Sequence, residues 1–106
     1  MRILFSLLVA SAVLISAGTA NAEELVVSQK KKRFDPALLN AKLGDTVLFD
    51  NDDRYAHNLF SETLGFEFNI RKQMPGDKHE MTLDKLGNFV VGCVIHPRMK
   101  MTIIVE

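Results

Sequence analysis

The chain has only one cysteine, Cys93, among its 106 residues. An internal disulfide is therefore excluded, although small domains often depend on a disulfide or a metal for stability. A lone thiol can be buried as a small hydrophobic side chain, or it can be kept for a chemical purpose. With a disulfide excluded, a metal is the remaining cross-link that this sequence offers.

An excess of charge of one sign is missing too, since 13 lysine and arginine residues balance 13 acidic residues. This balance gives no reason to expect a nucleic-acid partner or a stable association with an anionic membrane, and we expect a monomer. One short basic run, Lys30-Lys31-Lys32-Arg33, stands out. We interpret it first as a solvated strand end or loop, and second as a docking patch for an acidic partner.

Long apolar runs are absent except at the N-terminus. There Arg2 precedes an apolar segment at residues 3–15, and Ala20-Asn21-Ala22 follows as a small-residue cleavage site. This pattern is typical of a secretory signal peptide and is too short for a membrane span. We expect residues 1–22 to be the signal peptide, the protein to be periplasmic, and residues 23–106 to form one domain of 84 residues (106 − 22). A retained N-terminal anchor is the alternative.

No segment shows sustained helical periodicity, an internal repeat or low complexity. Instead, short runs of β-branched or alternating apolar residues are separated by turn signals such as Gly44-Asp45 and Pro75-Gly76. The strands expected from these runs are residues 24–29, 46–49, 64–71, 81–83, 88–93 and 100–106. The pattern predicts an all-β fold, an antiparallel Greek-key β-sandwich.

Residues that bind soft metals gather near the C-terminus, where Cys93, His96, Met99 and Met101 follow one another closely. A thiolate, an imidazole and a thioether on one loop suit an electron-transfer copper ion, which takes two histidines, one cysteine and a weak axial methionine. One imidazole is missing from this loop. The best candidate for it is His57, 36 positions before Cys93 (93 − 57).

The motif Cys93-x2-His96-x2-Met99, with Pro97 after its histidine and His57 far upstream, resembles the cupredoxins, a family of small blue copper proteins. The spacing of its loop is most similar to that of amicyanin. The resemblance implies a cupredoxin-like sandwich with one type 1 copper ion as its cofactor. It also implies a protein that is not an enzyme and that carries single electrons between redox partner proteins. The implied metal ligands are His57, Cys93, His96 and Met99.

Two further residues acquire expected roles from this resemblance, which covers about residues 34–106. Asn58 matches the asparagine that follows the first ligand, and its implied role is a hydrogen bond that ties the His57 segment to the Cys93 loop. Arg98 departs from the pattern, because amicyanin-like loops tend to carry an apolar residue there. A cation beside His96 argues against a purely hydrophobic docking face.

Met99 and Met101 compete for the axial position. Met99 gives a spacing from His96 that is similar to amicyanin, whereas Met101 gives a spacing that is similar to plastocyanin. Seven residues follow Met99 (106 − 99), as in both relatives, but only five follow Met101. We therefore expect Met99 to be axial and Met101 to pack within a strand.

The third histidine and the acidic run are expected to have no role at a metal. His79 lies between Lys78 and Glu80, so we expect it to be exposed and not a ligand. We interpret the cluster Asp50, Asp52 and Asp53 as polar residues that solvate a loop.

Three other functions compete with electron transfer. The same ligands could serve a periplasmic protein that handles copper ions. Cys93 could instead be the nucleophile of a thiol enzyme with His57 or His96 as its base, although so small a domain leaves little room for a substrate cleft. Finally, the cysteine and histidines could be incidental to a secreted β-domain. Replacement of His57 separates these hypotheses, because only a blue copper site would lose its colour.

Overall fold

The computed structural model describes residues 21–106, so most of the expected signal peptide lies outside the described residues. Within this range the fold is all-β, as predicted, and contains no helix. The described residues accordingly include no helix long and apolar enough to cross a membrane. The nine strands are β1 (Glu24–Lys30), β2 (Arg33–Asp35), β3 (Leu38–Ala41), β4 (Thr46–Asn51), β5 (Leu59–Ser61), β6 (Phe68–Asn69), β7 (Lys78–Thr82), β8 (Gly87–Cys93) and β9 (Lys100–Val105).

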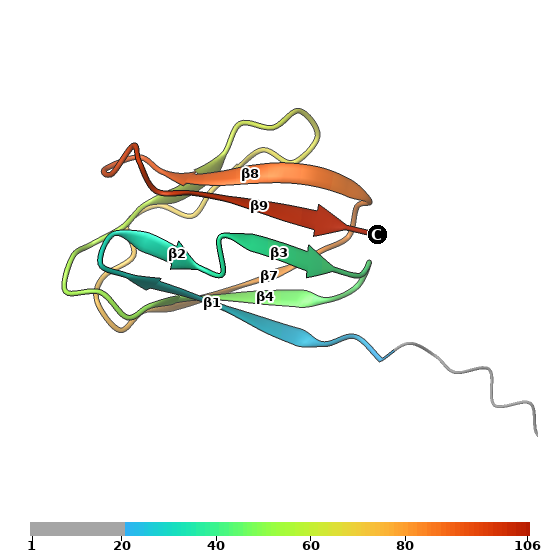
Figure 1. Cartoon of the computed structure of the whole chain (residues 1–106), viewed down its shortest axis with the longest axis horizontal. Helices are drawn as coiled ribbons and strands as arrows, with labels where there is room; N and C mark the ends of the chain where they lie inside the picture. The colour runs from blue at the N-terminus through green and yellow to red at the C-terminus, as the bar shows by residue number, and fades with distance from the viewer. Residues whose placement is uncertain (1–20) are drawn as a thin grey trace, which may run out of the picture.

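Two sheets pack face to face as a sandwich. One has the strand order β2-β1-β4-β7 and the other has the order β3-β9-β8-β5-β6. Figure 1 shows β8 and β9 in one layer and β1, β4 and β7 in the other. Most neighbouring strands are antiparallel, but each sheet also contains one parallel pair, β1 with β4 and β3 with β9. Both pairs require the chain to cross over between distant segments, which short sequence patterns do not reveal.

The alternation of side chains along two central strands, β4 and β8, helps to build the core between the sheets. In β8, Phe89, Val91 and Cys93 point inward and are buried. In β4, Asn51 is the last of the alternating buried residues. The pattern that packs the core therefore continues to the end of each strand and places Cys93 and Asn51 inside the same end of the sandwich.

The expected strands are found, with shifts of a few residues, as β1, β4, β6, β7, β8 and β9. The segment at residues 64–71 differs most, since only Phe68 and Asn69 form strand pairs there. Its alternating side chains, Phe66, Phe68 and Ile70, nevertheless pack against the core. The short strands β2 and β5 were not predicted, because three residues carry little periodicity.

The register of the strands defines two ends of the sandwich, which are used below. The Cys93 end holds the turn after β1, the loop after β4 at residues 52–58, the segment at residues 70–77 and the β8–β9 loop at residues 94–99. The Asp45 end holds the start of β1, the β3–β4 turn, the β7–β8 turn and the end of β9. In Figure 1 the Cys93 end lies on the left and the C-terminus marks the Asp45 end.

Candidate metal centre

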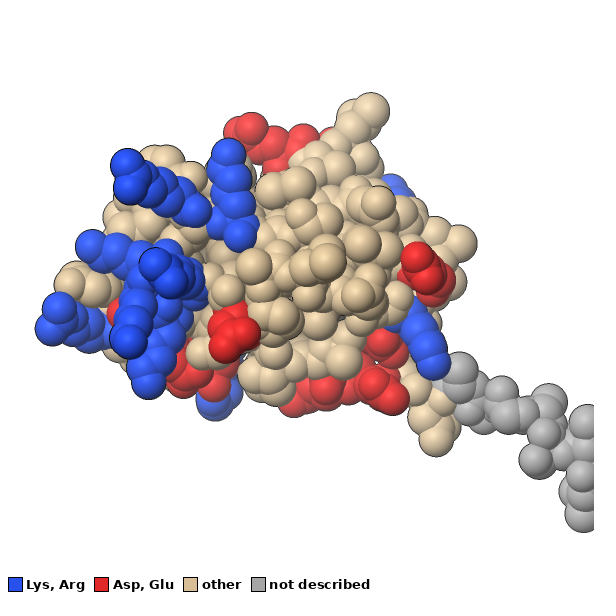
Figure 2. Space-filling view, viewed as in Figure 1, with Lys and Arg blue, Asp and Glu red and all other residues tan. Residues whose placement is uncertain are grey.

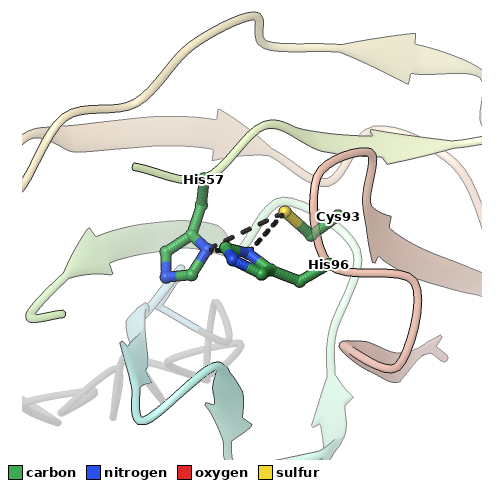
Figure 3. Close-up of side chains that lie close together, drawn as sticks. All are labelled: His57, Cys93 and His96. Carbon is green, nitrogen blue, oxygen red and sulfur yellow. Dashed lines mark hydrogen bonds between the residues drawn. The ribbon is translucent and has the colours of Figure 1, made fainter. Parts of the chain in front are cut away.

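Three of the predicted ligands converge at the Cys93 end. His57, Cys93 and His96 present donor atoms that lie within 4.8 Å of one another. The two Nδ1 atoms are 3.1 Å apart, and Cys93 Sγ lies 3.8 Å from His57 Nδ1 and 3.7 Å from His96 Nδ1. Figure 3 shows the three side chains turned toward one another, with His57 coming from a different segment than the other two. The fold thus brings His57 and Cys93, which are 36 residues apart in the sequence, into one cluster.

These distances fit three ligands of one metal ion. Imidazole nitrogen and thiolate sulfur bind a divalent first-row metal at about 2.0 and 2.3 Å. Donors in a trigonal plane would then be about 3.5 Å apart for two nitrogens and about 3.7 Å apart for nitrogen and sulfur. The observed sulfur–nitrogen distances, 3.7 and 3.8 Å, match this triangle, whereas the nitrogen–nitrogen distance of 3.1 Å is shorter than the ideal trigonal value. A trigonal set of two histidines and one cysteine is typical of type 1 copper, and the arrangement fits a single ion of this kind.

The fold holds His57 rigidly. Its side chain is fully buried, and its backbone pairs with Gln73, whose carbonyl accepts a hydrogen bond of 2.9 Å and whose N–H donates one of 2.7 Å. The Gln73 side chain donates to the carbonyls of Phe49 and Asp77 and accepts a hydrogen bond from Gln29. His57 is therefore anchored to both neighbouring segments through buried hydrogen bonds, which restrict its position.

Asp53 orients the ring of His57, which corrects the expectation that this residue only solvates a loop. Asp53 is buried, and its Oδ2 lies 3.1 Å from His57 Nε2. Burial by itself raises the pKa of Asp53, but hydrogen bonds from the N–H of Lys32, from His57 and from the N–H of Arg54 outweigh it and lower the pKa. The ionised carboxylate is an acceptor, so it fixes the proton on Nε2 and leaves the Nδ1 lone pair free.

Sequence reasoning missed Asp53 because loop spacing has no period. Asp53 precedes His57 by four residues, which would place the two on one face of a helix but says nothing in an irregular loop. Only a weaker signal in the sequence could have identified Asp53. A carboxylate close to a candidate metal-binding histidine is a common partner of its second ring nitrogen.

His96 has a more open environment. It is partly exposed, and its ring packs edge-on against Tyr55 with ring centroids 6.2 Å apart. Burial, followed by the charges of His57 and Lys32, lowers the pKa of His96 despite the opposing effect of Asp53. The ring also lines a surface groove together with Lys32. Of the two histidines, only His96 reaches this surface groove.

The register of β8 and β9 distinguishes the two methionines. The last pair of this ladder is Gly92 with Lys100, so continuation of the same register places Met99 opposite Cys93. Met101 lies opposite Val91, about 7 Å deeper along the strands. Met99 is buried, and its N–H donates to the carbonyl of His96 at 2.9 Å, which closes the loop. Met101 is a core residue of β9, as expected.

Asn58 ties the His57 segment to the Cys93 loop, but it does so through its backbone. Its N–H lies 3.4 Å from Cys93 Sγ, and its carbonyl accepts a hydrogen bond of 2.9 Å from Val94. The side-chain amide points elsewhere and donates to Asn69 Oδ1 at 2.7 Å. The expected link is therefore present, although its atoms are not those that a side-chain role would require. His79 is exposed on β7 and lies outside this cluster, as expected.

Comparisons with known proteins bear on the fold and on the site. The cupredoxin-like domain family matches residues 3–105, and no match was found among curated proteins. The chain is similar in structure to a copper-containing nitrite reductase from Thermus scotoductus SA-01, with a TM-score of 0.73, 28% identity and coverage of 78% of this chain but only 22% of the reductase. It thus spans about a fifth of that relative.

Two smaller proteins are similar over nearly their whole length. A purple cupredoxin from Nitrosopumilus maritimus has a TM-score of 0.69 and 23% identity, with coverage of 77% of this chain and 99% of that one, which supports the fold alone. The Cu(I) form of an amicyanin variant has a TM-score of 0.73 and 26% identity, with coverage of 85% of this chain and 88% of that one. With a family match that spans residues 3–105, a two-sheet sandwich and a converging His-Cys-His cluster, the chain belongs to the cupredoxin-like domain family.

Proposed function

We propose that this protein binds one copper ion through His57, Cys93, His96 and Met99 and carries single electrons between redox partner proteins. The observation that supports it most directly is the triangle of donor atoms, with edges of 3.1, 3.7 and 3.8 Å, at one end of a cupredoxin-like sandwich. The register that puts Met99 opposite Cys93 supports Met99 as the axial ligand.

A bound copper ion would supply a one-electron couple, and the chain would supply a site that changes little between the two oxidation states. Backbone pairing with Gln73 and the bond to Asp53 hold His57 in place. The N–H of Asn58 donates toward Cys93 Sγ, where it would stabilise a thiolate. Ligands held in this way leave a small reorganisation on electron transfer.

We further propose that the protein is a carrier and not an enzyme. Four side-chain ligands would leave the ion no open position for a substrate, and an open position is what catalytic metal sites retain. The nitrite reductase among the similar structures is a much longer chain, of which this protein spans 22%. Similarity to it therefore does not carry its activity to this chain.

The proposed location is the periplasm, after removal of residues 1–22. The pattern of Arg2, the apolar segment and the Ala20-Asn21-Ala22 site supports this proposal. Osmotic release of the periplasm followed by mass spectrometry of the intact protein tests it. A mature chain that begins at Glu23 is expected, and a membrane-retained full-length chain would contradict it.

The copper site is tested by the visible and electron paramagnetic resonance spectra of the exported protein after addition of one equivalent of Cu(II). An intense blue band with narrow copper hyperfine splitting is expected, and Cys93→Ala should abolish both. His79→Ala is the matched control, because His79 is exposed and lies outside the cluster. Pale copper that is unaffected by Cys93→Ala would reject electron transfer and favour copper handling.

A further inference from the structure

The lysines and arginines of the chain are concentrated at the Cys93 end. Figure 2 shows them gathered at one end of the molecule, where Figure 1 places β2 and the β8–β9 loop. The fold brings cations from four separate sequence segments together here. The cations at this end are Lys30, Lys31, Lys32, Arg33, Arg54, Arg71, Lys72, Arg98 and Lys100.

The opposite end has the reverse charge. The strand register brings together there five acidic residues and two lysines, namely Glu23, Glu24, Asp45, Asp84, Glu106, Lys42 and Lys85. The chain is balanced overall, with 13 charges of each sign, but the sandwich separates them along its length. A molecule with such a charge distribution is oriented by the field of an approaching charged partner.

The cations at the Cys93 end surround the exposed edge of His96. A groove of about 540 Å³ is lined by Lys32, Arg33 and Arg98 together with His96. Lys32 Nζ lies 4.4 Å from the centre of the Tyr55 ring, whose edge packs against His96. The ammonium group of Lys32 is thus separated from His96 by a single side chain, that of Tyr55.

The acidic residues at the Cys93 end offset only part of this positive charge at the surface. Asp53 is buried and accepts hydrogen bonds from the N–H groups of Lys32 and Arg54 and from His57. Asp52 is exposed beside Lys30, Lys31 and Lys32 and offsets one of their charges. Asp77, also exposed, accepts a hydrogen bond from the N–H of Met74. Glu62 is exposed, but it lies on the far side of the β8–β9 loop, beside Lys100.

Apolar side chains occupy the middle of the same surface. Val94 and Ile95, which precede His96 in the loop, are 54% and 52% exposed, and Pro97 follows His96 in the groove. An apolar centre with a charged rim is the usual organisation of a specific protein interface. The rim here is cationic, so the complementary surface is one with carboxylates around an apolar centre.

We propose that the Cys93 end docks an acidic redox protein, whose carboxylates face the cations while its redox centre approaches the edge of His96. This inference rests on the proposed electron-transfer function. A copper ion held by His57, Cys93, His96 and Met99 would supply one electron to the partner's centre and would itself pass from Cu(I) to Cu(II). An anionic membrane would also attract these cations, but it would cover His96, the ligand through which the exchange must occur.

A pair of probes that differ only in surface charge tests this proposal. Native cytochrome c is basic, whereas the same protein with succinylated lysines is acidic. Two quantities are measured for each probe as a function of salt: binding to the protein by titration, and the rate at which the reduced protein converts ferric to ferrous haem by stopped-flow absorption. At low salt the succinylated probe should bind more tightly than native cytochrome c and react at least tenfold faster. Both differences should vanish near 1 M salt, where charges are screened.

Charge reversal locates the effect. Lys31→Glu and Arg33→Glu are suitable because both side chains are exposed and, within residues 21–106, neither side chain makes a hydrogen bond or an ion pair. Each should slow the reaction with the succinylated probe several-fold, and the double variant should reverse the preference. Lys42→Glu is the control, because it changes the net charge equally but lies at the Asp45 end. All variants should keep the blue spectrum.

The outcomes separate the two proposals. Equal rates with both probes at low salt, or an equal loss in Lys42→Glu, would overturn the docking surface and leave electron transfer intact. Charge-dependent binding of the succinylated probe without electron transfer at any salt would support the surface and reject the proposed function. Sedimentation with phosphatidylserine vesicles at about 0.15 M salt, lost in the double variant and unaccompanied by any preference between probes, would overturn the protein partner in favour of a membrane.

Discussion

Each end of the sandwich contains one buried aspartate beside β4, and the two residues are bonded in nearly the same way. Asp45 accepts hydrogen bonds from the N–H groups of Glu23 at 2.9 Å and Lys42 at 2.8 Å. These bonds, larger in effect than its burial, lower the pKa of Asp45. Asp45 thereby fastens the start of β1 and the end of β3 to the turn before β4.

Asp53 does the same at the Cys93 end and adds one contact. It accepts hydrogen bonds from the N–H groups of Lys32 at 2.8 Å and Arg54 at 2.9 Å, and a third from His57 Nε2 at 3.1 Å. One carboxylate therefore holds the β1–β2 turn, the loop after β4 and the proposed metal ligand His57. At both ends a buried aspartate links neighbouring segments by accepting hydrogen bonds from their N–H groups. At the Cys93 end the same carboxylate also accepts a hydrogen bond from the proposed metal ligand His57, and so becomes part of the site.

The largest expected effect comes from removing the ligand that only one end possesses. His57→Ala should abolish the blue band and lower copper affinity by more than the roughly 100-fold lost with a hydrogen-bond partner behind a ligand. It also leaves Asp53 buried with one partner fewer, so the copper-free protein should unfold at lower denaturant concentration. Copper titration and chemical unfolding measure the two effects. Retention of the blue band would show that His57 is not a copper ligand, and the proposed difference between the two ends would then be wrong.

Substitution of each methionine by leucine tests which of the two is the axial ligand: Met99, just beyond the β8–β9 ladder, or Met101 within it. Met99→Leu should retain a blue protein with a higher reduction potential, because an apolar side chain in place of the thioether disfavours the more highly charged Cu(II). Met101→Leu is a volume-conserving change one layer deeper in the core and should cost less than about 1.5 kcal/mol of unfolding free energy with the spectrum unchanged. Voltammetry of both variants measures the reduction potential, and denaturant unfolding measures the stability. A shift in potential confined to Met101→Leu would make Met101 the axial ligand.

Matched substitutions of the two aspartates compare the ends directly. Asp53→Asn should lower copper affinity by about 10- to 100-fold, because the amide is a poorer acceptor for His57 and no longer fixes its ring. Asp45→Asn should destabilise the fold without changing copper affinity. Competition with a copper chelator and denaturant unfolding of the copper-free proteins provide the two readouts. Equal losses of copper affinity in both variants would show that Asp53 acts only through general stability.

The sequence predicted those parts of the site and fold that depend on local pattern. Cys93 and His96 are three residues apart, so their spacing alone indicates proximity, and the strand predicted at residues 88–93 is found as β8, which ends at Cys93. The role of Asp53 and the backbone bonds of Asn58 could not be predicted, because loop conformation decides which atoms meet. The parallel pairs, such as β1 with β4, also depend on tertiary contacts that no single segment encodes.

The smallest expected effect is the pH dependence of the Asp45 end. Because the folded-state pKa of Asp45 lies below its ordinary value of 3.8, its contribution to stability is fully present above that value and is lost as the pH falls through the lower, folded-state pKa. The difference in unfolding free energy between the wild type and Asp45→Asn should therefore be constant near neutral pH and shrink below about pH 4. Denaturant unfolding of the copper-free proteins between pH 7 and the acid limit of the native state measures it. A difference that persists unchanged into acid would mean that the hydrogen bonds to Glu23 and Lys42 do not depend on the charge of Asp45, and the likeness between the two ends would then extend only to their geometry.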